Sequence, residues 1–117
     1  MDKNRLANIN QWVNSVIPYD GSVGKVTNTL ADAMNGGQCR DYAKWKASTA
    51  LMAGADRNNL KILYGLIGKT PHSVLAYYPP DGGEPLILDN LSPEVLPLSK
   101  LHEYAGFESM PLPKDWK

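Results

Sequence analysis

Three side chains of this sequence are of the types that together perform nucleophilic catalysis: a thiol, an imidazole and a carboxylate. Cys39, the only cysteine, follows Gly36-Gly37-Gln38. Glycines let the backbone turn sharply, so this segment predicts a turn that places Cys39 at the start of a helix. The free N–H groups and the dipole at a helix N-terminus stabilise an anion and lower the pKa of a cysteine. Cys39 is therefore a candidate nucleophile, although a lone free cysteine is more often a small buried hydrophobic residue.

His72 and Asp89 are the candidate base and orienting group. His72 opens a predicted strand after Thr70-Pro71, whereas the other histidine, His102, lies in a polar tail and is interpreted as a surface residue. Asp89 lies in an otherwise apolar segment, although aspartate is depleted in strands and a buried carboxylate needs a partner. Each residue also has an ordinary explanation, because single histidines are mostly structural and a strand-end aspartate commonly caps a turn.

A predicted hairpin brings these two side chains together. If residues 80–83 form a four-residue loop, Val74 pairs with Asp89. His72 and Asp89 then become diagonal neighbours on one face of the sheet, within side-chain reach. If the helix that begins at Cys39 packs on that face, its N-terminus meets the imidazole. The three residues would then act as nucleophile, base and orienting group.

The hydrophobic periodicity predicts helices first and strands afterwards. Helical spacing is found in residues 5–16, where Trp12 is expected to fasten the helix to the core, and again in residues 39–53, with a short helical turn within 27–34. Alternation of apolar residues predicts strands at 60–66, 72–78 and 85–91, with 104–110 as a further candidate strand. The expected fold class is α+β, with a central helix packed on a small antiparallel sheet.

Length and charge narrow the functional class. The 117 residues fit one domain spanning 1–117, and twelve basic residues balance twelve acidic ones. A nucleic-acid-binding protein usually carries a basic stripe, and this chain has none, so no nucleic-acid partner is expected. No apolar stretch is long enough to cross a membrane, and none resembles a secretory signal. The chain as written is therefore expected in the cytoplasm, without membrane insertion.

Several segments resemble one protein family. Gly37-Gln38-Cys39 is similar to the active-site turn of transglutaminases. The match is closer to the bacterial transglutaminase-like cysteine proteinases, which include periplasmic proteases that release biofilm adhesins. It is carried by Gly37–Ala43, His72–Tyr78 and Glu84–Leu91. The resemblance covers roughly residues 30 to 112 and implies a papain-like/transglutaminase-like fold. It also implies the roles of three residues: Cys39 as nucleophile, His72 as general base and acid, and Asp89 as the group that orients the imidazole.

The resemblance further implies an oxyanion site and bears on calcium. The oxyanion site would use the Cys39 backbone N–H, with Gln38 as a candidate second donor. Adhesin-releasing members bind calcium through acidic residues around the cysteine, but here Gln38 and Arg40 flank Cys39, and Asp41 is the only remnant. Because calcium favours several oxygen ligands, we expect no metal site, no cofactor and no calcium requirement. Asp41 is expected to cap the helix start instead.

Together these features predict a cysteine peptidase that cleaves a peptide bond in a protein or peptide substrate through an acyl-enzyme. The same triad can also run the acyl transfer of a transglutaminase or a deamidase. A non-catalytic protein-binding module on the same fold is the third possibility. An activated cysteine alkylates quickly below pH 7 and a packing cysteine does not, so thiol reactivity separates the third possibility from the first two.

Overall fold

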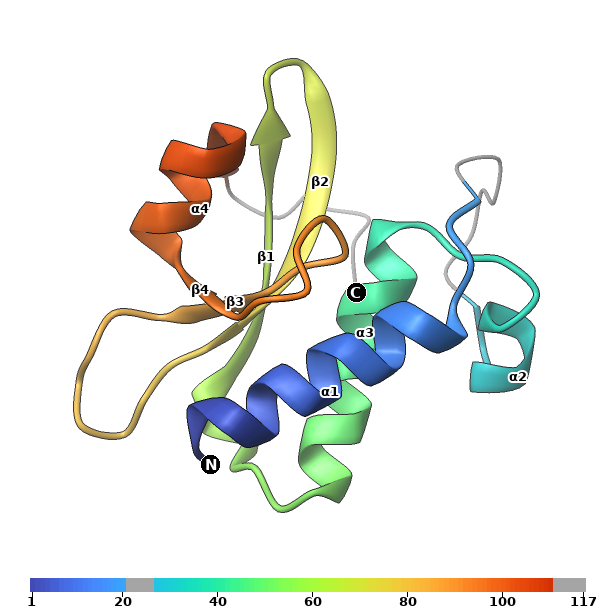
Figure 1. Ribbon diagram of the computed structural model, residues 1–117, viewed down its shortest axis with the longest axis horizontal. Helices are drawn as coiled ribbons and strands as arrows, with labels where there is room; N and C mark the ends of the chain where they lie inside the picture. The colour runs from blue at the N-terminus through green and yellow to red at the C-terminus, as the bar shows by residue number, and fades with distance from the viewer. Residues whose placement is uncertain (21–26, 111–117) are drawn as a thin grey trace.

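Five strands form the sheet that positions the candidate residues (Figure 1). The structure is a computed structural model that describes residues 1–20 and 27–110. Within these residues the strands lie in the order β4-β3-β2-β1-β5, and every neighbouring pair is antiparallel. Their bounds are Leu60–Ile67 (β1), Thr70–Tyr77 (β2), Leu86–Leu88 (β3), Leu96–Pro97 (β4) and Phe107–Met110 (β5). The expected mixture of helices and antiparallel sheet is confirmed.

The register between β2 and β3 agrees with the predicted hairpin. Leu75 lies opposite Leu88, and Tyr77 lies opposite Leu86. This register, continued along the chain, places Val74 opposite Asp89. However, β3 is much shorter than the predicted strand 85–91, and Asp89 comes directly after its last residue. Residues 70–74 of β2, which include His72, therefore have β1 as a neighbour on one side and no β3 partner on the other.

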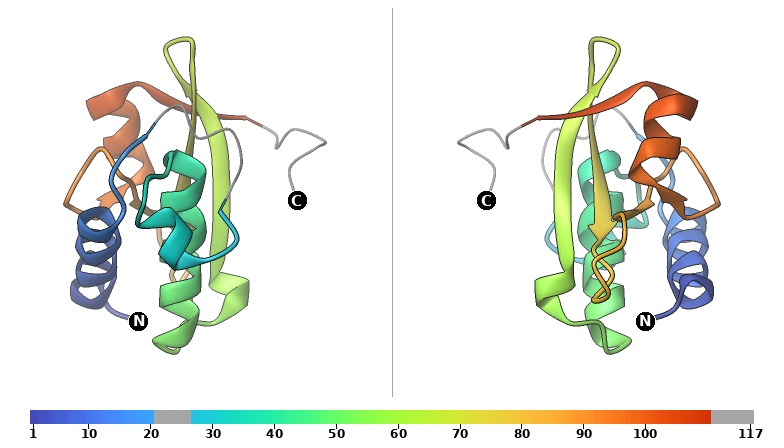
Figure 2. Two further views of the ribbon diagram at one scale, coloured as in Figure 1. Left: turned by 90° about the vertical axis from the view of Figure 1, so that its right-hand side faces the viewer. Right: turned by 90° about the vertical axis from the view of Figure 1, so that its left-hand side faces the viewer.

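The described part of the chain contains four α-helices, together with a 3₁₀ turn at Arg57–Asn59. They are α1 (Lys3–Val16), α2 (Leu30–Ala33), α3 (Cys39–Met52) and α4 (Leu98–Ala105). Figure 1 shows α3 and α4 on opposite sides of β1 and β2, and the side views in Figure 2 agree. One core cluster joins α1 and α3 to one face of the sheet, through residues such as Leu6, Ala50 and Leu75. Another cluster joins α4 to the other face, through residues such as Val74 and Leu101.

The first helix forms as predicted, but not every expected contact does. Leu6, Ile9 and Val13 are buried, which follows from their helical spacing. The expectation that Trp12 fastens this helix to the core is wrong, because its side chain is 48% exposed. No described helix has the length and apolar character that a membrane-crossing segment requires.

The segment after Asp89 departs most from the prediction. The candidate strand 104–110 is shorter, since β5 comprises only Phe107–Met110. Before it lie the short strand β4 and the helix α4, neither of which was predicted. Gly106 ends α4 in the left-handed conformation, with φ +71°, and so allows the chain to turn from helix into strand. His102 lies on α4 with its side chain exposed, and its Nδ1 lies 3.0 Å from the Phe107 carbonyl oxygen.

Candidate active site

The turn before Cys39 needs both of its glycines. Gly36 has φ +138°, a conformation that residues with a side chain rarely adopt. At Gly37 a Cβ atom would lie 2.9 Å from Ile17 Cγ2 and 2.9 Å from Asp41 Cβ, which is too close for real contacts. The chain can therefore pass between Ile17 and α3 only without a side chain at residue 37. This close passage delivers Cys39 to the first position of the helix, as the sequence predicted.

Asp41 fixes the start of α3. Its carboxylate is fully buried and accepts hydrogen bonds from the Gln38 N–H at 3.0 Å, the Thr27 N–H at 2.7 Å and the Thr27 hydroxyl at 2.8 Å. The bond from Gln38 is one half of a capping box, and the negative charge is favourable beside the positive end of the helix dipole. Asp41 therefore caps the helix, as expected, and also ties residue 27 to the turn that presents Cys39.

Replacing Asp41 by alanine is expected to lower the free energy of unfolding by about 2–3 kcal/mol, because two backbone N–H groups and one hydroxyl lose their acceptor. Urea denaturation followed by circular dichroism measures the change. Asp32→Ala is the matched control, since Asp32 also lies in the first turn of a helix but is exposed. Equal losses in the two variants would show that the Asp41 contacts contribute nothing beyond a surface charge at a helix start.

His72 and Asp89 form a buried pair. His72 Nε2 lies 2.7 Å from Asp89 Oδ1, and both side chains are almost fully removed from solvent. The predicted diagonal placement of the two residues is therefore confirmed. The helix α1 also holds the aspartate, because the Asn14 side-chain amide donates to the Asp89 carbonyl oxygen at 3.1 Å. Phe107 presents its ring nearly perpendicular to the imidazole, with 6.1 Å between the centroids, and restricts the motion of the imidazole on that side.

The Cys39 thiol hydrogen-bonds with the His72 ring. Because His72 Nε2 is bonded to Asp89, the other ring nitrogen, Nδ1, is the one left to bond the thiol. Burial alone would raise the pKa of Cys39, but hydrogen bonds from His72 and from the Ser73 backbone, together with the attraction of His72, lower it below its ordinary value. Burial opposes the charge on His72 as well, yet hydrogen bonds with Asp89 and Cys39 raise its pKa to about 9. The arrangement therefore favours a thiolate beside an imidazolium.

The route by which Cys39 reaches His72 differs from the expectation. The sequence argument placed α3 on the sheet face that carries His72 and Asp89. Instead, Ala50 of α3 packs with Leu75 and Tyr77, which point to the other face of β2. Cys39 meets His72 where β2 lacks a β3 partner, so the sulfur accepts a hydrogen bond from the Ser73 backbone N–H. Ser73 is thus a site residue that the sequence analysis missed, because its role depends on where β3 ends.

A small cavity opens at the thiol. It has a volume of about 220 Å³, and its lining residues are Gln38, Cys39, Arg40, Tyr64, Pro71, His72 and Ser73. Gln38, the candidate oxyanion donor, is thus placed at the cavity. Arg40, Tyr64 and Pro71 were not singled out as site residues in the sequence. Tyr64 lies directly opposite Ser73 in the β1–β2 ladder, and only this pairing reveals it as a wall of the cavity.

No protein-family model matches the chain, and no curated protein matches it. Among solved structures, three of LapG from Legionella pneumophila are similar. The EGTA-treated structure has a TM-score of 0.72 with 27% identity, and the calcium-bound structure has a TM-score of 0.71 with 28% identity. Each match covers 92% of this chain, which spans 60–62% of the LapG chains. The resemblance to transglutaminase-like cysteine proteinases and the papain-like/transglutaminase-like fold are thereby confirmed.

The comparison corrects the expectation on calcium. One LapG structure is calcium-bound and another is EGTA-treated, which points to calcium involvement and contradicts the expectation of no calcium requirement. Within the described residues, no group of three His, Cys, Asp or Glu side chains is placed to hold a metal ion. The carboxylate of Asp41 already accepts three hydrogen bonds from protein donors.

Proposed function

We propose that this protein is a cysteine peptidase that cleaves a peptide bond in a protein substrate, with Cys39, His72 and Asp89 as its catalytic triad. The observation that carries the proposal is the continuous chain of contacts from the Cys39 thiol through the buried His72 ring to the Asp89 carboxylate. A packing cysteine needs neither partner. The similarity to LapG supports the same class of enzyme.

In this mechanism the thiolate attacks the carbonyl carbon of the scissile bond. The developing oxyanion lies near the N-terminus of α3, where the Cys39 backbone N–H and the Gln38 side chain are the candidate donors. His72 then transfers its proton to the leaving amine, the carbon–nitrogen bond breaks, and an acyl-enzyme remains on Cys39. In the second half of the reaction His72 takes a proton from water, which attacks the acyl group and releases the thiolate. Asp89 keeps the imidazole oriented through both steps.

The proposal is tested by mapping new N-termini in a bacterial protein extract after incubation with the purified chain. We expect cleavage products with the native protein, a loss of at least about 1,000-fold in rate for Cys39→Ser and His72→Ala, and of about 100-fold or more for Asp89→Asn. His102→Ala is the matched control, because the other histidine lies on α4, outside the site. Products that persist unchanged in Cys39→Ser would rule out the proposed nucleophile.

The acceptor of the acyl group is decided in a second assay. A fluorescent primary amine added to the same extract becomes attached to proteins if the enzyme is a transglutaminase, whereas a peptidase produces new N-termini. Both assays are run with calcium and with EGTA, because one of the similar LapG structures is calcium-bound and another is EGTA-treated. A protein without either activity, but with a bound partner, would fit the binding-module hypothesis.

A further inference from the structure

Two side-chain amides of the helix α1 bind the chain that follows β3. The Asn10 amide donates to the carbonyl oxygens of Ser92 and Pro93, at 2.9 and 3.2 Å. The Asn14 amide donates to the carbonyl oxygen of Asp89 at 3.1 Å and to that of Ser92 at 3.5 Å. The two asparagines are four positions apart, so they lie on one face of the helix. Of these two amides, the one on Asn14 reaches a residue of the triad.

The Asp89 carboxylate has few anchors of its own. Its Oδ1 lies 2.7 Å from His72 Nε2, whereas its buried Oδ2 has no hydrogen-bond partner within the described residues. Asp89 also comes directly after the last residue of β3, so the ladder between β2 and β3 does not fix its backbone. The direction of the carboxylate therefore depends on how the backbone of residue 89 is held. The bond from Asn14 holds it against α1.

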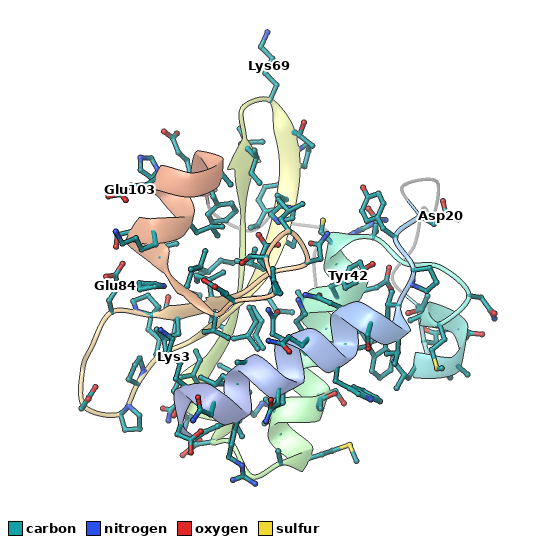
Figure 3. All side chains as sticks on the ribbon, viewed as in Figure 1. Lys3, Asp20, Tyr42, Lys69, Glu84 and Glu103 are labelled. Atoms are coloured by element: carbon teal, nitrogen blue, oxygen red, sulfur yellow. The ribbon has the colours of Figure 1, made fainter. Side chains whose placement is uncertain are left out.

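The same helix is fixed to the element that carries the nucleophile. At the end of α1, the carbonyl oxygen of Ile17 accepts a hydrogen bond from the Tyr42 hydroxyl at 2.6 Å, and Figure 3 shows Tyr42 near this end of the helix. Val13, directly before Asn14, belongs to the same core cluster as Tyr42. Tyr42 lies on α3, three residues after Cys39. The helix α1 thus connects the first turn of α3 to the segment after β3.

We propose that Asn14 is a positioning residue, which fixes the backbone of Asp89 against α1 and thereby keeps the Asp89 carboxylate directed at the His72 ring. The inference rests on the proposed function, since it concerns the same triad. A carboxylate that turns away from the imidazole no longer stabilises the imidazolium, and the Cys39 thiolate then loses its counter-charge. Asn14 is not among the residues that line the cavity at the thiol, so it acts through Asp89.

A second variant of the same helix separates this role from an ordinary structural one. Asn14→Ala removes the bond to Asp89, whereas Asn10→Ala removes two bonds to the same segment and none to Asp89. Asn10 is fully buried and Asn14 is half-buried, so the control should lose at least as much stability as the test variant. Alanine also favours the helix at both positions. A larger effect of Asn14→Ala on the triad therefore cannot come from general loosening.

The first readout is the N–H proton that His72 Nε2 donates to Asp89. The chain contains only two histidines, so NMR of protein labelled with ¹⁵N-histidine follows this proton in the intact chain, with His102→Ala identifying the other ring. We expect the proton to exchange with water about 10-fold faster in Asn14→Ala, because the bond to the carboxylate opens more often. In Asn10→Ala the exchange rate should stay within about 2-fold of the native value.

The second readout is the rate at which iodoacetamide alkylates Cys39 at pH 6. Asn14→Ala should lower this rate about 3-fold in the native chain and should lower it no further in Asp89→Ala, which has no carboxylate to direct. Unchanged exchange of the His72 proton in folded Asn14→Ala would overturn the inference. An equal effect of Asn10→Ala, or a further 3-fold loss on top of Asp89→Ala, would overturn it as well.

A third variant covers a failure of Asn14→Ala to fold. Asn14→Leu keeps the branched shape of the side chain without its donors, and both readouts are expected to change in the same direction. A native protein whose His72 proton is not protected from exchange would contradict the proposed triad, and with it this inference. A proton that is protected in the native chain and equally protected in the Asn14 variants would overturn the role of Asn14 alone.

Discussion

Replacing His72 by alanine is expected to slow the alkylation of Cys39 by iodoacetamide about 10-fold or more near pH 6, because an ordinary thiol is less than about 1% ionised at that pH. In the native protein the His72 ring and the Ser73 N–H lower the pKa of Cys39, so a larger share of Cys39 is thiolate. Removing the imidazole removes both its hydrogen bond and its charge. Since Cys39 is the only cysteine, the rate of label incorporation, measured by mass spectrometry, reports on this residue alone.

The pH dependence of the alkylation rate shows how the charges of Cys39 and His72 are coupled. The pKa of Cys39 is lowered and that of His72 is raised to about 9, so the ion pair exists between those two values. The native rate should therefore rise at lower pH than that of an ordinary thiol and remain high up to about pH 9. Above that value the imidazolium loses its proton while the thiolate remains, which leaves a reactive cysteine without a general acid. In His72→Ala we expect a single titration at about pH 8.5, the value of a free thiol.

His102→Ala serves as the control, because it removes the other histidine, on α4, and leaves Cys39, His72 and Asp89 in place. Its alkylation profile should follow that of the native protein. If the native chain itself shows one titration near the free-thiol value, and His72→Ala shifts nothing, Cys39 and His72 are not coupled. In that case the non-catalytic binding module becomes the better explanation of the fold.

The parts of the fold that could be predicted are those fixed by local pattern. The Pro80-Asp81-Gly82-Gly83 turn and the alternation on both sides of it set the register of β2 and β3, and the same register brings His72 beside Asp89. The glycine turn likewise locates Cys39 at the first residue of α3. In both cases neighbouring residues determine the geometry, so a sequence argument suffices.

The parts of the fold that the sequence analysis did not predict depend on contacts between distant segments. Trp12 has the spacing of a core residue, but α1 packs through Leu6, Ile9 and Val13, and the tryptophan falls outside that stripe. No helix was predicted between residues 91 and 104, yet Leu98–Ala105 forms a helix whose apolar residues cover the second face of the sheet. A two-residue strand such as β4 carries too few residues for any periodicity to show.

The missing site residues have the same cause. Ser73 bonds the thiol through its backbone N–H, and a backbone donor carries no signal in its residue type. Lys46 has the type of a surface residue, yet its side chain is 0% exposed in the folded chain. The partners of Asp41 at residue 27 are likewise fourteen positions away in sequence. The sequence analysis found the residues whose side chains are reactive, and missed those whose role depends on what surrounds them in the folded chain.

Gly65→Ala is expected to lower the free energy of unfolding by about 3 kcal/mol, because it forces atoms into a space that the backbone already fills. Gly65 lies between two strands, opposite His72 on β2 and opposite Ser109 on β5. A Cβ atom there would overlap the carbonyl oxygen of Glu108 and lie 2.9 Å from Phe107 Cε1. A carbonyl in a ladder cannot rotate away as a side chain can, so β5 must move. Thermal and urea unfolding measure the loss.

Gly68→Ala separates collision from backbone strain. Gly68 has φ +63° in the β1–β2 turn, with nothing within 4 Å of the position of a Cβ atom, so alanine there costs only the strain of about 1 kcal/mol. The difference between the two losses in unfolding free energy is the cost of the overlap between a side chain at residue 65 and the backbone of β5. Moving β5 also moves Phe107 away from the edge of the His72 ring, so Gly65→Ala should broaden or shift the NMR signal of His72, and Gly68→Ala should not. Equal effects in both variants would mean that β5 does not pair closely with β1, and the packing that holds the imidazole would have to come from Asp89 alone.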